Sequence, residues 1–385
     1  MLDAPPFGPA RRDVTRPRAG LGPLSVLRRA TAFATLAGLV ACADLGGSGS
    51  TDAGTTANTG NGAGNDSGTN VAVAAGAAIE LANDGGYLAA ARGVMQRAKV
   101  RLDVVQFETT QGKTEALLTN DIIDAHKRGV AVHVLLDDEV DKNGILLATL
   151  KAAGVDAKLD SSSVRTHAKI VSNESEAMIG STNWSYTSIT YNHEANVVVR
   201  VPSVVAALHD YLDKLWAKSS KTLPTTPVGT SDATLYTDAG FAALATPVID
   251  AAKSKIWIIT YGMNLDPQYK DGDVWKLVDR VIAAHERGVD VRVILETADY
   301  ATDTNAVNKQ ARDALVAAGI DARLDPPSTI THAKVLVADD VAIVGTNNWG
   351  YGGFALYHEV GIRTENAAVL AGLEAYAASI WAASK

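Results

Sequence analysis

The sequence predicts an α/β protein built from two similar lobes, each a mixed β-sheet flanked by helices on both faces. The first observation is an internal repeat: Thr166-His167-Ala168-Lys169 returns 165 residues later as Thr331-His332-Ala333-Lys334. The second is the alternation, in each half of the chain, of apolar runs of strand length with amphipathic segments of helix length. Because such alternation is typical of sheets covered on both sides, we expect one sheet in each lobe.

The expected elements follow the same order in both lobes. In the first lobe they are a helix at 87–97, a strand at 100–107, a helix ending before Gly129, a strand at 130–136 and a helix closing at Gly154. The second lobe repeats them as a helix at 242–252, a strand at 256–261, a helix ending before Gly288, a strand at 289–295 and a helix closing at Gly319. A glycine after the last helical turn is a common stop signal. The repeated His-containing stretch follows as a strand, then a hairpin to strands at 177–179 and 341–344 and a final helix.

The first 70 residues differ in composition from the rest of the chain. Six arginines precede an apolar run at 30–40, which is too short to span a bilayer and is typical of a signal peptide. The run ends in Leu39-Val40-Ala41-Cys42, which resembles the bacterial lipobox, so we expect 1–42 to be a lipoprotein signal peptide with Cys42 as the lipidated residue. A true start near Val26 is an alternative. Cys42 is the only cysteine, so the mature chain would contain no disulfide.

The other boundaries follow from composition and from the repeat. Residues 43–70 are mostly Gly, Ser, Thr, Asn and Ala, which predicts a disordered tether. We expect the first lobe at 71–220, a linker at 221–230 that contains Pro224 and Pro227, and the second lobe at 231–385.

The charge balance bears on the class of substrate. The net charge is −8, and removing residues 1–41 takes away six Arg and two Asp, which leaves −12. Proteins that bind nucleic acid without sequence preference rely on Lys and Arg against the phosphates. The acidic balance therefore argues against nucleic acid as the main substrate, although a local basic cleft would override it.

The repeated stretches carry side chains that a hydrophobic core does not need. In an extended strand His167 and Lys169 project to the same face, as do His332 and Lys334. A Gly-hydroxyl-x-Asn turn follows in each lobe and can bring an Asn beside the Lys; the turns are Gly180-Ser181-Thr182-Asn183 and Gly345-Thr346-Asn347-Asn348. Lys and Asn suit the non-bridging oxygens of a phosphate, and two facing His can supply a nucleophile and a proton donor. This set predicts in-line displacement at phosphorus.

Two copies of His-x-Lys followed by Gly-Ser/Thr-x-Asn resemble the phospholipase D superfamily, and the resemblance covers about residues 79–385. It implies two phospholipase D-like lobes related by pseudo-twofold symmetry. It also implies catalysis through a phosphohistidine, with no metal and no cofactor. By the usual assignment of the family, His167 is the nucleophile and His332 the general acid; the reverse order is the alternative. Asn183 and Asn348 are then catalytic with Lys169 and Lys334.

The resemblance adds further site residues. The family has a downstream Glu that orients the catalytic His, and Glu194 and Glu359 match it; the alternative is that they are exposed strand charges. Substrate contacts are expected from the turn hydroxyls and from the aromatic residue that ends the first strand of each lobe, although the latter could be core residues: Ser181, Thr346, Phe107 and Tyr261. Glu174 stands where the second copy has the family's Asp, as Asp339, and a structural role is expected for both.

Several other residues invite a functional interpretation but have a simpler one. His126 and His285 end predicted helices, where a cation stabilises the helix dipole. His193 and His358 adjoin the glutamates and should face the opposite side. The acidic run at 137–139 is expected to be a solvated loop rather than a metal site. Trp184 and Trp349 either frame the cleft mouth or pack between the lobes.

These observations predict a metal-independent phosphodiesterase of the phospholipase D type. It would hydrolyse phospholipid headgroups or transfer the phosphatidyl group to another alcohol, as in cardiolipin-synthase-like chemistry. We expect a monomer with one active site between its lobes, held by its lipid anchor at the membrane of the bacterial cell envelope. The alternatives are an endonuclease that uses the same chemistry and, less expected, an inactive lipid-anchored scaffold.

Overall fold

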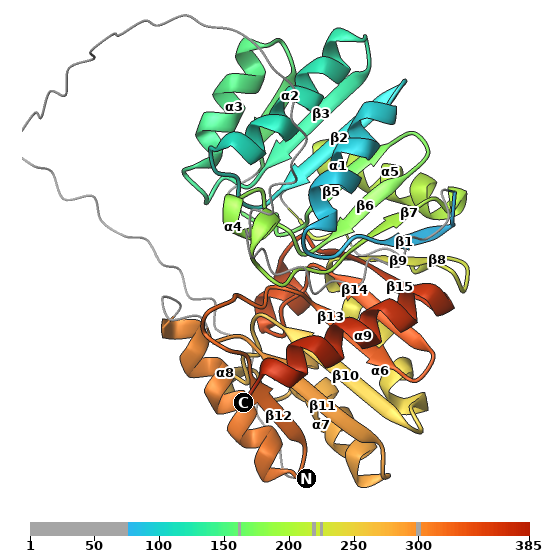
Figure 1. The fold of residues 1–385 in the computed structure, drawn as a ribbon, viewed down its shortest axis with the longest axis vertical. Helices are drawn as coiled ribbons and strands as arrows, with labels where there is room; N and C mark the ends of the chain where they lie inside the picture. Colours follow the sequence, from blue (N-terminus) through green and yellow to red (C-terminus); the bar gives the residue numbers. More distant parts are fainter. Residues whose placement is uncertain (1–75, 161–162, 218–220, 224–225, 298–301) are drawn as a thin grey trace, which may run out of the picture. The chain divides into compact units, whose positions relative to one another are not determined.

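Two β-sheets, one in each half of the chain, form the framework of this computed structural model (Figure 1). The structure describes residues 76–160, 163–217, 221–223, 226–297 and 302–385, which belong to one compact unit. The predicted signal peptide, Cys42 and the predicted tether lie outside these residues. Among the described residues, no helix has the length and apolar character needed to cross a membrane.

The first lobe contains a seven-stranded mixed sheet in the order β1-β7-β6-β5-β2-β3-β4. Strands β2, β3 and β4 run parallel, and the other neighbours pair antiparallel. The strands are β1 (Ile79–Leu81), β2 (Arg101–Gln106), β3 (Ala131–Leu136), β4 (Asp156–Leu159), β5 (Ile170–Asn173), β6 (Ala177–Gly180) and β7 (Asn196–Val199). The helices are α1 (Gly86–Arg97), α2 (Lys113–Lys127), α3 (Asn143–Ala152), α4 (Tyr186–Thr190) and α5 (Pro202–Ala217).

The second lobe repeats this topology and adds an edge strand, in the order β12-β11-β10-β13-β14-β15-β9-β8. Its strands are β8 (Val228–Gly229), β9 (Thr234–Thr237), β10 (Lys255–Thr260), β11 (Asp290–Leu295), β12 (Asp321–Leu324), β13 (Val335–Ala338), β14 (Val341–Gly345) and β15 (Val360–Thr364). Its helices are η1 (Asp238–Gly240), α6 (Phe241–Ala251), η2 (Pro267–Tyr269), α7 (Asp273–Glu286), α8 (Thr302–Ala317), the π-helix η3 (Gly352–Leu356) and α9 (Ala367–Ala383). Strand β8 lies inside the segment expected to be a plain linker.

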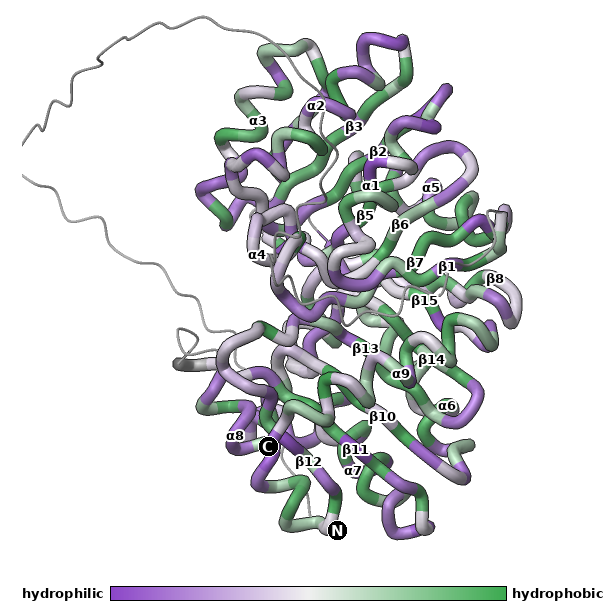
Figure 2. Tube along the Cα trace, viewed as in Figure 1, coloured by the Kyte–Doolittle hydropathy of each residue, from purple (hydrophilic) through white to green (hydrophobic). Residues whose placement is uncertain are grey.

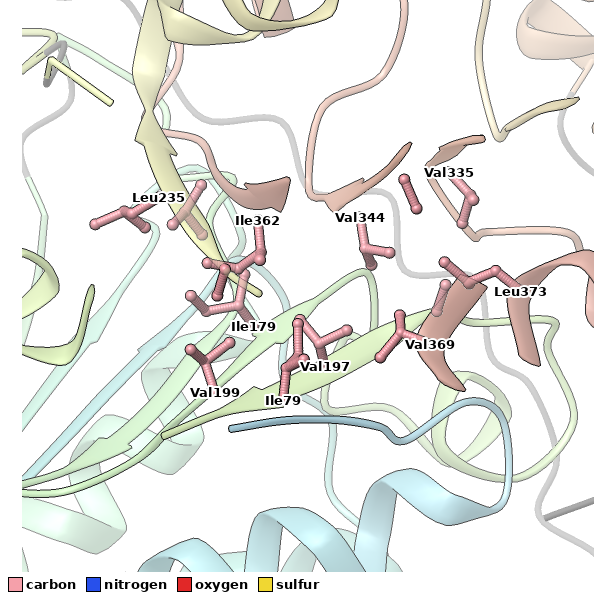
Figure 3. Close-up of a cluster of buried hydrophobic side chains, with 14 of the residues drawn as sticks. Ile79, Ile179, Val197, Val199, Leu235, Val335, Val344, Ile362, Val369 and Leu373 are labelled. Carbon is pink, nitrogen blue, oxygen red and sulfur yellow. The ribbon is translucent and has the colours of Figure 1, made fainter. Parts of the chain in front are cut away.

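Alternate side chains of the strands enter different hydrophobic cores. In β2, Val104 packs in a core with α1, α2 and α3, whereas Val105 belongs to a core shared by both sheets. The shared core also contains apolar residues of α5 and α9, and Figure 3 shows side chains of both lobes pointing into it, among them Ile179, Val344 and Leu373. A third core packs α6 and α7 against the second sheet. Helices therefore cover both faces of each sheet, as predicted, and Figure 2 shows apolar residues concentrated along the strands.

One local prediction is wrong: the His-x-Lys stretches precede the strands instead of lying in them. Strand β5 begins at Ile170 and β13 at Val335. The backbone N–H of His167 donates to the carbonyl of His358 (3.0 Å), and that of His332 donates to the carbonyl of His193 (2.8 Å). Each motif therefore pairs its backbone with the other lobe before it joins its own sheet.

Candidate active site

The two motif histidines lie at the contact between the lobes, and each binds a glutamate of the opposite lobe. Nδ1 of His167 is 3.0 Å from Oε1 of Glu359, and Nδ1 of His332 is 3.0 Å from Oε2 of Glu194. All four side chains are buried, with the histidines 7% and 8% exposed and the glutamates 0%. The sequence suggested these glutamates as partners but did not tell which His each one serves. Neither lobe holds a complete His–Glu pair by itself.

The cross-lobe pairing follows from the backbone contacts of the motifs. The carbonyl of His193 accepts hydrogen bonds from the N–H groups of His332 and Ala333, at 2.8 and 2.9 Å. Glu194 is the next residue in the chain, so this contact delivers its carboxylate to the ring of His332. The carbonyl of His358 and the side chain of Glu359 do the same for the first lobe.

The turn hydroxyls hold the two carboxylates. Ser181 donates its hydroxyl proton to Glu194, and Thr346 donates to Glu359. The same hydroxyl oxygens accept from the backbone N–H groups of Ala195 and of Val360, each at 2.9 Å. Both residues are fully buried, so the structure gives them a role in positioning the glutamates, and a direct contact of either hydroxyl with substrate stays a prediction.

The motif lysines and the two strand-end aromatics surround the histidines. Lys169 and Lys334 are 3% and 4% exposed, and each Nζ donates to the carbonyl of the His two residues earlier. The ring of Phe107 meets His167 edge-on at 4.9 Å, and Tyr261 meets His332 at the same distance. The lysine nitrogens lie 5.0 and 5.2 Å from these ring centroids. The aromatics expected to line a cleft thus lie beside the histidines and lysines.

The turn asparagines carry polar atoms that are not satisfied within the described residues. Oδ1 of Asn183 and Oδ1 of Asn348 are buried and accept no hydrogen bond there. Oxygen and nitrogen of an amide can exchange places by rotation, so either atom can face an incoming ligand. An unsatisfied buried amide is unfavourable, and a bound group with matching donors or acceptors would relieve it.

Comparison with known proteins identifies the family of this chain. A family model described as "Cardiolipin synthase, PLD-like domain" matches residues 92–216 and 246–381, which together make up more than half of the chain. The chain belongs to this phospholipase D-like family.

Individual relatives of this phospholipase D-like chain are more distant. It is 33% identical over 97 residues to the mitochondrial cardiolipin hydrolase of Danio rerio, a match of 24% of this chain and only 43% of that protein. The phosphatidylserine synthase of Haemophilus influenzae Rd KW20 has a similar fold, with a TM-score of 0.62 and 12% identity over 80% of this chain and 87% of that one. The polyphosphate kinase of Porphyromonas gingivalis aligns with a TM-score of 0.53 and 12% identity, covering 76% and 48% of the two chains.

A second layer of residues, which sequence reasoning missed, fixes the backbone of the glutamates. Oδ1 of Asp84 accepts the N–H of Glu194 at 2.7 Å, and Oδ1 of Asp238 accepts the N–H of Glu359 at 3.1 Å. Both aspartates have a positive backbone φ angle, 46° and 51°, which is uncommon for residues other than glycine. Their strained backbone is therefore held by the contacts that order the site.

Tyrosines from the C-terminal helices of the lobes complete this layer across the lobe contact. Tyr376 of α9 donates to Asp84, and Tyr211 of α5 donates to Asp238, both at 2.8 Å. Both pairs recur in the sequence, the aspartates 154 residues apart and the tyrosines 165 apart. The repeat was therefore a usable signal, although nothing in it indicated that the two pairs meet.

The other histidines and tryptophans considered in the sequence make contacts that indicate a structural role. His358 and His193 approach Asp238 and Asp84 through Nδ1, at 3.1 and 3.4 Å, and so belong to the second layer. Trp184 is 1% exposed and donates from Nε1 to the hydroxyl of Tyr87. Like Trp349, which is 3% exposed, it packs in a core.

The acidic residues outside the His–Glu pairs order the loops. Asp137 is buried and accepts the N–H of Thr166, directly before the motif His, so the expectation of a solvated loop is wrong for this residue. Glu174 accepts backbone N–H groups at 99–101, and Asp339 accepts those at 253–255. The longer Glu thus does the same structural work as the Asp of the second copy. Within the described ranges, no group of three or more His, Cys, Asp or Glu is arranged to hold a metal ion.

Burial sets the charge states of the site. It lowers the pKa of His167 well below its ordinary value, and Lys169 and Lys334 lower it further. The same burial lowers the pKa of Lys169 to about 8 and that of Lys334 to about 7. An anion placed between these lysines would favour their charged forms, because an opposite charge offsets the penalty of desolvation.

Proposed function

We propose that this protein cleaves the headgroup phosphodiester of phospholipids through a phosphohistidine intermediate. The observation that carries the proposal is the pair of buried histidines, His167 and His332, each held at Nδ1 by a carboxylate of the other lobe. Nε2 of either ring makes no hydrogen bond with the residues that the structure describes. A carboxylate on Nδ1 fixes the tautomer and leaves Nε2 for the chemistry, as in other carboxylate-oriented histidines.

The reaction proceeds in two displacements at phosphorus. Nε2 of His167 attacks phosphorus while the bond to the headgroup oxygen breaks, and Nε2–H of His332 gives its proton to that oxygen. Water then attacks the phosphohistidine, the P–N bond breaks, and His332 takes a proton from the water. An alcohol in place of water gives phosphatidyl transfer, so hydrolysis and transphosphatidylation share one intermediate.

The unequal surroundings of the two pairs support this assignment of roles. Glu194 accepts an additional hydrogen bond from Nδ2 of Asn192 at 3.3 Å, and the corresponding residue beside Glu359 is a tyrosine. Burial opposes ionisation of Glu194, but His332, Lys334 and Ser181 together outweigh burial and lower the pKa of this carboxyl. Burial raises the pKa of Glu359 to about 7. Burial lowers the pKa of His332, and the anionic Glu194 counters this effect. Glu194 thus favours the protonated form that a general acid requires, whereas a neutral His167 suits a nucleophile.

The lysines and asparagines would stabilise the reacting phosphate. Lys169 and Lys334 approach from the two lobes and supply positive charge to the non-bridging oxygens, whose charge develops during displacement. Asn183 and Asn348 add amide groups that the fold leaves unsatisfied at Oδ1. Because these groups are preorganised and buried, they need little rearrangement when the substrate binds.

A phospholipid is the substrate that we favour, for two reasons. Two of the matched proteins, a cardiolipin hydrolase and a phosphatidylserine synthase, are named for phospholipid chemistry. The acidic balance of the chain, −8 over all residues, does not favour the phosphate backbone of nucleic acid. Lipidation at Cys42 and a site in the bacterial cell envelope are part of the proposal, since an anchor would keep the enzyme next to its substrate.

Intact mass spectrometry during turnover tests the proposal. The protein would be mixed with phosphatidylcholine or phosphatidylethanolamine in the presence of EDTA and quenched within the reaction. We expect an acid-labile phosphatidyl adduct that is lost in His167→Ala and accumulates in His332→Ala. His126→Ala, at the end of α2, is the matched control and should behave as wild type.

Each other outcome points to a different function. An adduct that forms only with an oligonucleotide would identify a nuclease. No adduct with any phosphodiester would favour an inactive scaffold. Accumulation in His167→Ala with loss in His332→Ala would reverse the two roles.

A further inference from the structure

Four exposed apolar side chains lie in the two segments that connect catalytic residues. Tyr186 and Tyr191, 49% and 62% exposed, lie between Asn183 and Glu194. In the second lobe, Tyr351 and Leu356 are 39% and 46% exposed between Asn348 and Glu359. Each segment leaves the site at the Asn and returns to it at the Glu. Residues next to two of these side chains contact the site: Asn192 donates to Glu194, and the ring of Tyr357 lies 6.4 Å from that of His167. We therefore assign the four side chains to the border of the site. We call Tyr186, Tyr191, Tyr351 and Leu356 the rim residues.

The rim residues recur with the same spacing as the catalytic residues. Tyr351 follows Tyr186, and Leu356 follows Tyr191, by the 165 residues that separate the two motif histidines. Single exposed apolar residues are ordinary on protein surfaces. A matched pair in both lobes, in the segments that connect the candidate catalytic residues, is a different observation, because burial in a core does not explain it.

The rim segments are also free of charge. Residues 184–192 read Trp-Ser-Tyr-Thr-Ser-Ile-Thr-Tyr-Asn, and residues 349–357 read Trp-Gly-Tyr-Gly-Gly-Phe-Ala-Leu-Tyr. Neither stretch contains Asp, Glu, Lys, Arg or His, although 20% of the whole chain is charged. The residue that follows each stretch, directly before the Glu, is a histidine, His193 or His358. A surface without charges leaves water at a lower cost than a charged one. It also lacks the cations that a nucleic-acid backbone requires.

The rim is ordered by local contacts. Ser185 caps helix α4, which Figure 1 shows beside the loops of the first lobe, and the hydroxyls of Tyr186 and Tyr191 lie 3.2 Å apart. In the second lobe, Tyr351 stacks on Tyr269 with a centroid distance of 4.0 Å and an angle of 4°. Buried Phe354 holds the segment to the lobe from inside. A preordered apolar surface loses little conformational entropy when it binds.

We propose that the rim residues are the surface by which the protein sits on a phospholipid bilayer, with both rim segments in the interfacial layer. Tyrosine suits this layer because its ring is apolar and its hydroxyl stays in contact with water and headgroups. The catalytic cleft then faces the headgroup phosphates of the same leaflet. The inference rests on the proposed phospholipid substrate. The rim residues carry no charge, and Arg165, which lies over the ring of Tyr357, is paired with Glu139. We therefore expect binding that depends little on anionic lipid or on low salt.

Vesicle binding and two kinds of substrate test this surface. The full chain, with Cys42→Ser in every sample so that no lipid is attached, would carry Tyr186→Ser, Tyr191→Ser, Tyr351→Ser and Leu356→Ser together. We expect partition onto phosphatidylcholine vesicles and turnover of vesicle lipid each to fall by about tenfold or more. Turnover of a short-chain phosphatidylcholine, kept below its critical micelle concentration, should change by less than about twofold, because the reacting groups are untouched.

The matched control replaces exposed apolar residues that lie outside the rim: Val100→Ser, Ile145→Ser and Val316→Ser, originally 67%, 54% and 50% exposed. These changes should leave vesicle binding and turnover unaltered. Equal losses in the control and rim variants, or no loss in the rim variant, would overturn the proposal. So would a rim variant that dissociates a dimer in analytical ultracentrifugation, since the rim would then join two copies of the chain.

Failure of the proposed function would look different. A wild-type protein that turns over neither monomeric nor vesicle lipid, and forms no phosphatidyl adduct, would contradict the phospholipid chemistry, whatever the vesicle-binding result.

Discussion

The His167 and His332 halves of the candidate site contain the same types of side chain but have different neighbours. Beside His167, the guanidinium of Arg165 lies 4.9 Å from the ring of Tyr357 and forms an ion pair with Glu139. The repeat places Ile330 at the position of Arg165 in the second lobe. Beside His332, the position that corresponds to Tyr357 is Asn192, whose amide donates to Glu194.

In the proposed mechanism, these different neighbours would let a duplicated site carry out two unlike tasks. A nucleophile must be neutral and a general acid must be protonated at the same pH, so two identical His–Glu pairs would be poorly matched to the first displacement. Neighbours that push the pKa values of two similar groups apart are a general means of assigning such roles. Here the cation Arg165 lies near His167, and Asn192 donates an additional hydrogen bond to Glu194, the carboxylate that pairs with His332.

Removing either carboxylate should have the largest effect on activity and should distinguish the two halves most clearly. Glu359→Gln should lower kcat/KM on phospholipid by on the order of a thousandfold, because an amide no longer holds His167 in the reactive tautomer. Glu194→Gln should cause a similar loss, but an activated aryl phosphodiester should restore much of it, since a good leaving group needs no proton. Only Glu359→Gln should remain impaired on the aryl substrate.

The control for this experiment is Glu176→Gln, a buried carboxyl that pairs with Arg97 and Arg200 away from the site. It should alter stability without changing the ratio of the two substrates. If the aryl substrate rescued Glu359→Gln and left Glu194→Gln impaired, the roles of the two halves would be reversed.

The two buried lysines predict a stability that rises with pH. Lys169 and Lys334 lose their protons near pH 8 and pH 7 in the folded protein but near 10.5 when unfolded. Between these values the unfolded chain binds more protons, so raising the pH favours the folded state. From about pH 7 to about pH 9 we expect the free energy of unfolding to rise by on the order of 3 kcal/mol from these two groups. Urea unfolding at both pH values measures it.

The double variant Lys169→Met/Lys334→Met isolates the effect of the lysines. Its stability should lack this rise, whereas other titrating groups, such as Glu359, still contribute in both proteins. Equal pH dependence of wild type and variant would show that the lysines keep their charge in the folded site.

The sequence predicted those features that depend on periodicity and on the repeat. The strand expected at 100–107 is observed at Arg101–Gln106, because an apolar run between two helical patterns has few other solutions. The repeat marked the candidate catalytic side chains because no core requires them. The sequence wrongly predicted His167 and His332 within strands. Their backbone partners come from the other lobe, and such partners leave no local signal in the sequence.

The pairing across the lobes was beyond the sequence. A repeat establishes that Glu194 and Glu359 are equivalent, but it does not say which His each one contacts. The hydroxyls of Ser181 and Thr346 were predicted to meet substrate, and their contact with the carboxylates depends on the fold of the hairpin turn. In both cases the deciding geometry arises only when two distant segments pack together.

The cross-lobe tyrosines provide a weaker test of the comparison. Tyr376→Phe removes the hydroxyl that binds Asp84 and should lower kcat by about tenfold, because Asp84 orders the backbone of Glu194. Tyr211→Phe should act through Asp238 on the other half. If His167 is the nucleophile and His332 the general acid, the loss of kcat in Tyr376→Phe should be smaller on the aryl substrate. The loss of kcat in Tyr211→Phe should be the same on both substrates.

Tyr87→Phe is the matched control for these variants, since Tyr87 is also buried but its hydroxyl accepts from Trp184 in a core. It should change stability and leave kcat within about twofold. A loss of kcat as large as that of the other two variants would mean that burial, and not the contact with Asp84 or Asp238, explains their effect.

The smallest expected effect concerns the cation beside His167. Burial is the main reason for the low pKa of His167, and Arg165 adds to it by repelling the imidazolium. Arg165→Leu should therefore raise this pKa and move the acidic limb of the kcat/KM profile to higher pH by a few tenths of a unit. The reciprocal change, Ile330→Arg, should lower the pKa of His332 and move the alkaline limb to lower pH, because the general acid would lose its proton earlier. If both variants moved the same limb, the two halves would not differ in the way that their neighbours indicate.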